Sequence, residues 1–86
     1  MQTAKLQRIA VAALEDIKGR DIEVINTTKL TSLFDRIIIA SADSTRQVKA
    51  LARNVREKVE EAGGEVIGVE GEDGGEWVLV DLGNIV

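Results

Sequence analysis

Two amphipathic helical patterns, each followed by two short runs of strand-forming residues, constrain what this chain can fold into. The first pattern runs from Ala4 to Lys18, and the second begins after Ser44. In both, apolar residues recur at spacings of three and four, as in a helix with one buried face. A chain of 86 residues is long enough for one domain only. The order of patterns therefore predicts a single small α/β domain, residues 1–86, with the element order α-β-β-α-β-β.

The first helix and the strand after it have recognisable limits. The apolar stripe of the helix comprises Leu6, Ile9, Ala10, Ala13, Leu14 and Ile17. Thr3 is a residue type that caps the start of a helix, and Gly19 is the type that follows its end. Residues Asp21–Asn26 alternate apolar and polar side chains, which predicts a strand with Ile22 and Val24 facing inward. We expect this strand at an edge of the sheet.

A central strand and the second helix follow. Ile37–Ile39 is a continuous β-branched run, which is typical of a core strand covered on both faces. Ser44 and Gln47 form a capping-box pattern at the start of the second helix. The apolar stripe of that helix comprises Val48, Leu51, Ala52, Val55, Val59 and Ala62. Gly63-Gly64 ends it, and Glu65–Val69 returns as a strand. Strand, helix and strand in succession predict a right-handed βαβ unit with parallel neighbouring strands in a mixed sheet.

The last stretch combines a glycine-rich acidic loop with a strand that contains the only tryptophan. Residues 70–76 form the loop, Trp77–Leu82 the strand, and Gly83-Asn84 a two-residue hairpin signal. Side chains of a strand alternate between its faces, so Trp77, Leu79 and Asp81 share one face. The face that carries Asp81 is expected to point outward. Ile85-Val86 then begins a further strand.

Composition excludes several classes of function. The chain has no cysteine and no histidine, so it lacks a thiolate nucleophile, a zinc–sulfur site and the commonest general base. No cofactor is expected. The first residues lead directly into the charged amphipathic pattern, without the features of a signal peptide or a membrane span. We therefore expect a cytoplasmic protein without a membrane partner.

Charge is distributed unevenly along the chain. Residues 1–58 contain 11 basic and 7 acidic side chains, whereas residues 59–86 contain 8 acidic and no basic ones. The asymmetry argues against a surface that binds nucleic acid throughout, and it favours an acidic face that meets a basic partner. The alternative interpretation is that the carboxylates only keep the protein soluble.

The charged and glycine-rich segments suggest two kinds of ligand site, one for a metal ion and one for an anion. The carboxylates Glu70, Glu72, Asp73, Glu76 and Asp81 lack the alternating ligand pattern of a calcium loop, so a solvated acidic loop is favoured over a metal site. The glycines among them do not precede a helix and do not match a dinucleotide fingerprint. A better anion site is the start of the second helix, with Ser44, Thr45 and Arg46, although capping alone explains Ser44.

Trp77 is either a core residue or an interface anchor. Because alternation places it beside Leu79 and Asp81 on the outer face, next to the acidic loop, we favour a protein-binding patch with an apolar centre and a charged rim.

Several segments together resemble a known family. They are Thr31-Ser32-Leu33-Phe34-Asp35-Arg36-Ile37-Ile38-Ile39-Ala40-Ser41, Ser44-Thr45-Arg46-Gln47-Val48, Val69-Glu70-Gly71 and Glu76-Trp77-Val78-Leu79-Val80-Asp81-Leu82-Gly83. In combination they are similar to the ribosomal silencing factor, or Iojap-like, family, over nearly the whole chain. The resemblance implies a nucleotidyltransferase-like topology without catalytic residues.

The resemblance also implies a partner and a mechanism. Members bind the large-subunit ribosomal protein L-fourteen and block joining of the ribosomal subunits when nutrients run short. The residues that match the partner-facing segment of the family are Glu70, Trp77, Leu79, Asp81 and Gly83, with Ser44, Arg46, Glu72 and Glu76 as secondary candidates. Asn84 stands where members usually have aspartate, and the last strand and C-terminal helix of the family are expected to be missing.

Two alternatives come from other classes of function. A nucleotidyltransferase-like enzyme would need a Gly-Ser turn followed by paired carboxylates for two Mg²⁺ ions, and no such arrangement occurs in the sequence. A self-associating interaction domain would use an open sheet edge to pair with a second copy, so a homodimer is a further expectation.

Overall fold

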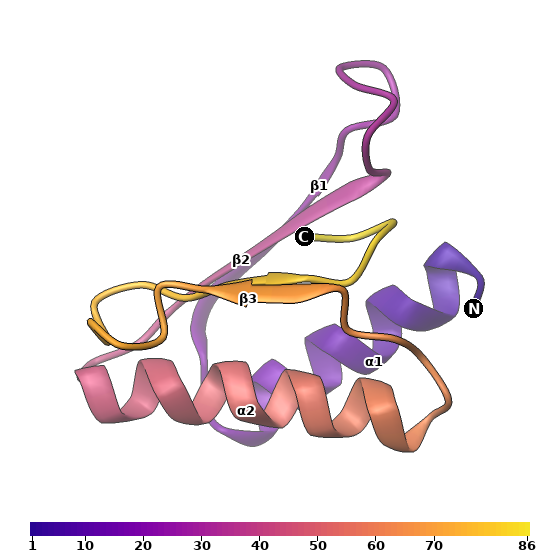
Figure 1. Cartoon of the computed structure of the whole chain (residues 1–86). Coiled ribbons are helices and arrows are strands. Elements are labelled where there is room, and N and C mark those ends of the chain that lie inside the picture. Colours follow the sequence, from indigo (N-terminus) through magenta and orange to yellow (C-terminus); the bar gives the residue numbers. More distant parts are fainter.

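All 86 residues are described by the computed structural model, which contains two helices and four short strands. In chain order these are α1 (Thr3–Asp16), β1 (Arg20–Asn26), β2 (Arg36–Ser41), α2 (Thr45–Glu61), β3 (Gly68–Glu70) and β4 (Leu79–Asp81). Both helices lie on one face of the strands, so the molecule has two layers (Figure 1). The α/β class and the order α-β-β-α-β-β are confirmed.

The strands form two antiparallel pairs instead of one continuous mixed sheet. β1 pairs with β2, and β3 pairs with β4. The prediction that the strands flanking α2 are parallel neighbours was wrong, because β3 pairs with β4 through the loop that joins them. Closing so short a loop costs less conformational entropy than pairing across the whole of α2. β1 does lie at an edge, as expected.

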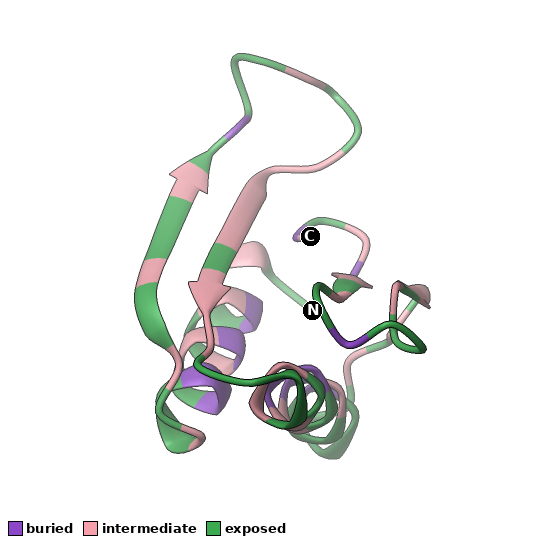
Figure 2. Ribbon diagram, turned by 90° about the vertical axis from the view of Figure 1, so that its left-hand side faces the viewer, coloured by how far each residue is buried: buried purple, intermediate pink, exposed green.

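The core lies between the two helices and the strand layer. Its buried side chains are Leu6, Ala10, Ala13, Leu14, Leu51, Val55, Val59, Leu82 and Ile85. Buried positions follow one side of each helix, whereas the strands are mostly half-buried or exposed (Figure 2). The stripes predicted for both helices therefore supply most of the core. Ala62 is an exception: it is exposed, because α2 ends one residue earlier, at Glu61.

The helix ends differ in how well the sequence predicted them. The cap of α1 is Gln2, and Thr3 is the first helical residue. The Thr3 hydroxyl donates to Asp35 Oδ2 at 3.0 Å. Ser44 does cap α2, since its Oγ accepts from the Gln47 N–H at 3.1 Å. The side-chain amide of Gln47 (Nε2) donates to the backbone carbonyls of Ile17 and Lys18, both at 3.2 Å. This side chain thus ties the start of α2 to the end of α1.

Two strand residues that were predicted to lie in the core are exposed. Val24 pairs with Ile38 and therefore shares the face of the sheet that packs on the core, but at the edge of the sheet it is 37% exposed. Ile39 is 48% exposed. β2 is covered by the helices on one face only, so Ile38 packs against the core and Ile39 does not.

The last residues of the chain add a short parallel segment to β2. Ile85 forms a bridge with Arg36, and the Val86 N–H donates to the Arg36 carbonyl at 3.1 Å. The Val86 carbonyl in turn accepts from the Ile38 N–H at 2.9 Å. Ile85 is only 1% exposed. The segment after the hairpin therefore pairs with the free edge of β2 and closes the core beside Leu82.

Neither helix is both long and apolar enough to cross a membrane.

Candidate functional site

The face predicted to be outermost on the last strand is exposed in the structure. Trp77 is 59% and Leu79 37% exposed, and Asp81 on the same side is half-buried. Leu82 and Val80, on the opposite side, belong to the core or pack against it. The strand itself is shorter than expected, since β4 begins at Leu79. We call Trp77, Leu79 and Asp81 the tryptophan face.

A glycine supports the tryptophan. Gly71 has a φ of 81°, in the left-handed region, and a Cβ placed on it would lie 2.7 Å from two carbons of the Trp77 ring and 2.6 Å from the Trp77 carbonyl oxygen. The ring thus packs directly on the Gly71 backbone. No local sequence pattern predicts this role of Gly71, although Val69-Glu70-Gly71 is one of the segments that carry the family resemblance.

One carboxylate of the acidic loop forms an ion pair within the protein, and the others do not. Glu72 Oε2 lies 3.2 Å from Nη1 of Arg56 on α2, and both side chains are partly exposed. Glu70, Asp73 and Glu76 are exposed and make no ion pair. A surface pair of this kind stabilises a protein only slightly. Glu70 and Glu76 therefore provide the uncompensated charge that borders the tryptophan face.

Asp81 and Gly83 have a structural role that the sequence analysis did not identify. The Asp81 Oδ1 accepts a hydrogen bond from the Gly83 N–H at 2.8 Å, within the turn that leads to Ile85. Gly83 has a φ of 89°, which only glycine adopts readily. Asp81 therefore stabilises the turn and also places a carboxylate beside Leu79. An experiment that substitutes Asp81 has to distinguish loss of the turn from loss of the charge.

The secondary candidates on α2 lie outside the tryptophan face. Ser44 and Arg46 are exposed. The Ser44 hydroxyl oxygen accepts a hydrogen bond from the backbone N–H of Gln47. The structure therefore accounts for Ser44 as a helix cap.

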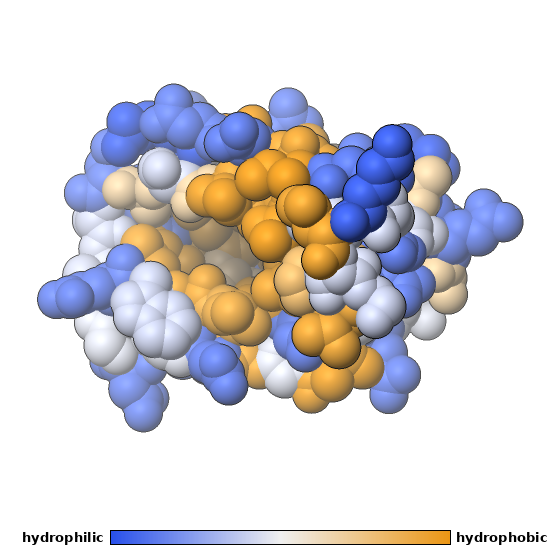
Figure 3. Space-filling view, turned by 90° about the horizontal axis from the view of Figure 1, so that it is seen from above, coloured by the Kyte–Doolittle hydropathy of each residue, from blue (hydrophilic) through white to orange (hydrophobic).

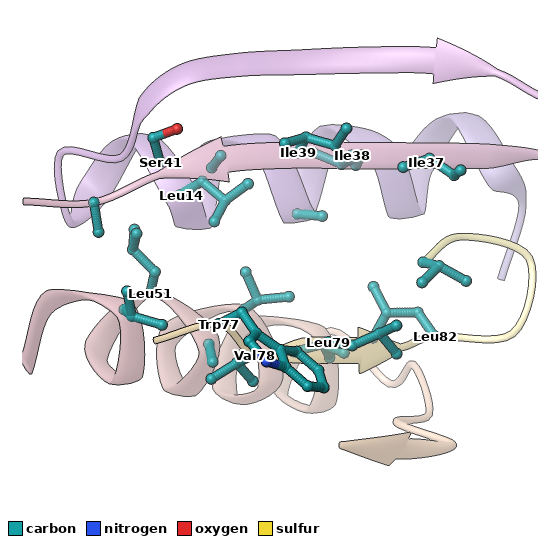
Figure 4. A pocket seen from close by; sticks show the side chains of 18 of the residues that line it. Leu14, Ile37, Ile38, Ile39, Ser41, Leu51, Trp77, Val78, Leu79 and Leu82 are labelled. Atoms are coloured by element: carbon teal, nitrogen blue, oxygen red, sulfur yellow. The ribbon is translucent and has the colours of Figure 1, made fainter. Parts of the chain in front are cut away.

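A deep apolar groove separates β2 from the segment that precedes and includes β4. It has a volume of about 580 Å³, and 18 of its 20 lining residues are hydrophobic. From above, it is a hollow surrounded by apolar side chains (Figure 3). Ile37, Ile38 and Ile39 line one side of it, and Trp77, Val78 and Leu79 line the other (Figure 4). The sequence analysis did not predict this groove, because periodicity identifies the faces of strands but not which strands are neighbours.

Replacing Gly71 with alanine should displace the tryptophan. The added methyl group would lie 2.7 Å from two ring carbons, closer than van der Waals contact allows, and an alanine at a φ of 81° would be strained. Together these effects should lower the stability by about 1–3 kcal/mol. We expect a shift in the fluorescence maximum of Trp77 and a lower urea midpoint. Gly74→Ala is the matched control, since a Cβ at Gly74 has no neighbour within 4 Å. Identical fluorescence in the two variants would show that Gly71 does not support the ring.

The sequence matches a described family over its whole length. The profile of the family described as "Ribosomal silencing factor during starvation" matches residues 1–86. A Chromobacterium violaceum protein named Ribosomal silencing factor RsfS is 55% identical over 86 residues, which are 100% of this chain and 70% of that protein. A Bacillus subtilis protein of the same name is 35% identical over 86 residues and is covered to 73%.

Solved structures agree with the sequence matches. A crystal structure of a Chromobacterium violaceum protein superimposes with a TM-score of 0.97 at 54% identity, covering 99% of this chain and 71% of that one. A Bacillus halodurans structure gives a TM-score of 0.91 at 30% identity, with 96% and 77% covered. At these identities the similarity extends beyond the fold to the sequence that forms it.

Proposed function

This chain belongs to the ribosomal silencing factor family, and on that basis we propose that it represses translation by binding the large ribosomal subunit and preventing the subunits from joining. The family supports the ribosome-silencing role. The partner that we propose is the large-subunit ribosomal protein L-fourteen, and the time of action is nutrient limitation. The protein would act in the cytoplasm, where ribosomes assemble.

The observation that best supports this proposal is the exposed tryptophan face. An indole that is 59% exposed beside an exposed leucine is an unusual surface for a chain with only two aromatic residues. Tryptophan is enriched among the residues that contribute most to protein–protein binding. The unpaired carboxylates of Glu70 and Glu76 at its border would attract a basic ribosomal protein. We propose Glu70, Trp77, Leu79, Asp81 and Gly83 as the binding residues.

The proposed mechanism is steric. A domain that occupies the joining surface of one subunit excludes the other subunit by its volume, and it needs neither a cofactor nor catalysis. We therefore propose a repressor that is not an enzyme. Sucrose-gradient sedimentation with isolated subunits tests this directly: the protein should travel with large subunits and reduce the fraction of joined ribosomes as its concentration rises. Joined ribosomes that are unaffected by saturating protein would contradict the proposal.

Reversing the charge at Asp81 should weaken ribosome binding in a salt-dependent way. Asp81→Lys places a cation on the tryptophan face, and exposed charges act over roughly 10 Å at 0.1 M salt. We therefore expect a larger loss of affinity at low salt than at high salt, mainly through slower association. Binding to immobilised large subunits at several salt concentrations measures this.

Asp81→Asn is the matched control for the turn. Its side-chain oxygen can still accept the Gly83 N–H, while the charge is removed. If charge matters, Asp81→Asn should show a smaller loss of affinity that also decreases with salt, but less steeply than the loss in Asp81→Lys. If Asp81→Asn binds like the wild type and Asp81→Lys merely has a lower urea midpoint, Asp81 acts only through the turn.

A further inference from the structure

The segment that carries the tryptophan has little backbone support of its own. Residues 71–78 join β3 to β4 and belong to no helix or strand. None of the backbone hydrogen bonds outside the helices and strands involves any of these residues. A loop without such bonds opens easily, so a defined conformation depends on the contacts that it makes with the rest of the protein. The position of Trp77 therefore depends on those contacts.

Two contacts fasten this segment to α2, which lies beside it (Figure 1). Arg56 Nη1 donates to Glu72 Oε2 at 3.2 Å, and this is the only side-chain hydrogen bond that residues 71–78 form. Gly75 is buried, and a Cβ placed on it would lie 3.1 Å from Lys49 Cε. The Gly75 backbone thus packs against the first turns of α2. One helix therefore holds the segment at two points, one through charge and one through close packing.

The ion pair lies next to the support of the tryptophan ring. Glu72 follows Gly71 directly in the chain, and the Trp77 ring packs on the Gly71 backbone. A displacement of Glu72 therefore moves the backbone on which the ring rests. Arg56 is connected in this way to the tryptophan face without belonging to it.

Glu72 was expected as a secondary contact with the partner, and the structure favours a different role. Its carboxylate is already paired with Arg56, whereas Glu70 and Glu76 have no ion pair. A partly exposed pair contributes little to the stability of a whole domain. The local opening of a loop that lacks other hydrogen bonds is governed by equally small free energies, so the same pair has a large effect there.

We propose that Arg56 and Glu72 are positioning residues for partner binding. Their ion pair holds the segment so that Gly71 supports Trp77 in the orientation that the partner meets. This inference rests on the proposed function, because it concerns the same tryptophan face. A surface that is ordered before binding loses less conformational entropy on association than one that must first be ordered. Breaking the pair therefore weakens binding without removing an atom that touches the partner.

Charge reversal and charge exchange in the 86-residue protein test the proposal. Arg56→Glu and Glu72→Arg each place like charges opposite one another, and the double variant restores an ion pair with opposite polarity. We expect each single variant to lower the fluorescence anisotropy of Trp77, because the ring loses its support. Each should also weaken binding to large subunits by about three- to tenfold. The double variant should restore the wild-type anisotropy and bring the affinity to within about twofold of wild type.

Lys58→Glu is the matched control. Lys58 lies on the same helix, its side chain is about as exposed as that of Arg56, and it pairs with Glu61 within α2 at 3.7 Å. The substitution changes the net charge by the same amount as Arg56→Glu, but it leaves the Arg56–Glu72 pair intact. It should not change the anisotropy of Trp77. Arg56→Lys keeps a cation opposite Glu72 and should retain the wild-type anisotropy.

The two readouts separate this proposal from the proposed function. Unchanged anisotropy in both single variants would overturn the positioning role. Restored anisotropy without restored binding in the double variant would also overturn it, because Arg56 or Glu72 would then contact the partner itself. If the anisotropy follows the expected pattern but the wild-type protein does not bind large subunits, the proposed function is wrong and the pair still positions the tryptophan.

Discussion

Replacing Trp77 with alanine is expected to reduce binding to the large ribosomal subunit by about 30-fold, which corresponds to about 2 kcal/mol. The indole is mostly exposed in the free protein, so its loss removes contact area with the partner and little of the core. Co-sedimentation with large subunits at a series of protein concentrations measures the change. Stability should fall much less, because the side chain is already 59% exposed in the free protein.

Leu33→Ala is the matched control for Trp77→Ala. Leu33 is 80% exposed and lies in the loop between β1 and β2, away from the tryptophan face. The Leu33→Ala substitution therefore removes an exposed apolar side chain from a different part of the surface. Equal affinity of Trp77→Ala and Leu33→Ala for large subunits, with both proteins folded, would contradict the assignment of the tryptophan face as the partner-binding surface.

Replacing Ile85 with alanine is expected to destabilise the protein by about 2–4 kcal/mol. The side chain is 1% exposed and contacts the core formed by both helices, so its truncation leaves a cavity in a small domain. A domain of this size buries too little surface to have stability in reserve. Urea denaturation followed by circular dichroism should show a much lower midpoint, or a protein that is unfolded in buffer.

Ile39→Ala is the comparison for the same chemical change at an exposed site. Ile39 is 48% exposed and lies on the face of β2 that the helices do not cover, so we expect a loss below about 1 kcal/mol. If both substitutions lower stability equally, burial at Ile85 is not what stabilises the fold.

The helices were the most predictable part of the fold. Their apolar stripes fixed which side faces the core, because helix periodicity depends on residues close together in the sequence. The strands were less predictable. Val24 is exposed at the edge of the sheet although it shares a face with Ile38, and Ile39 lies on the face of β2 that the helices do not cover. Both results depend on long-range packing, which is not encoded in the alternation of a single strand.

The candidate site was predicted in part for the same reason. Alternation identified the exposed face of Trp77 and Leu79, and the structure confirms that exposure. Their role in binding stays a prediction. The contact between Trp77 and Gly71, the turn at Gly83 and the groove beside β2 join segments separated by loops, and no local pattern reveals them.

The position of Ile85 also bears on how the protein folds as it is synthesised. Asn84 and Val86 form hydrogen bonds to Arg36 across the molecule, and the Ile85 side chain between them completes a core that the helices begin. When α1, α2 and the β1–β2 hairpin have left the ribosome but residue 85 has not, the core lacks the Ile85 side chain. The apolar side chains of the helices then stay exposed to solvent. We therefore expect cooperative folding during synthesis only after residue 85 has left the ribosome.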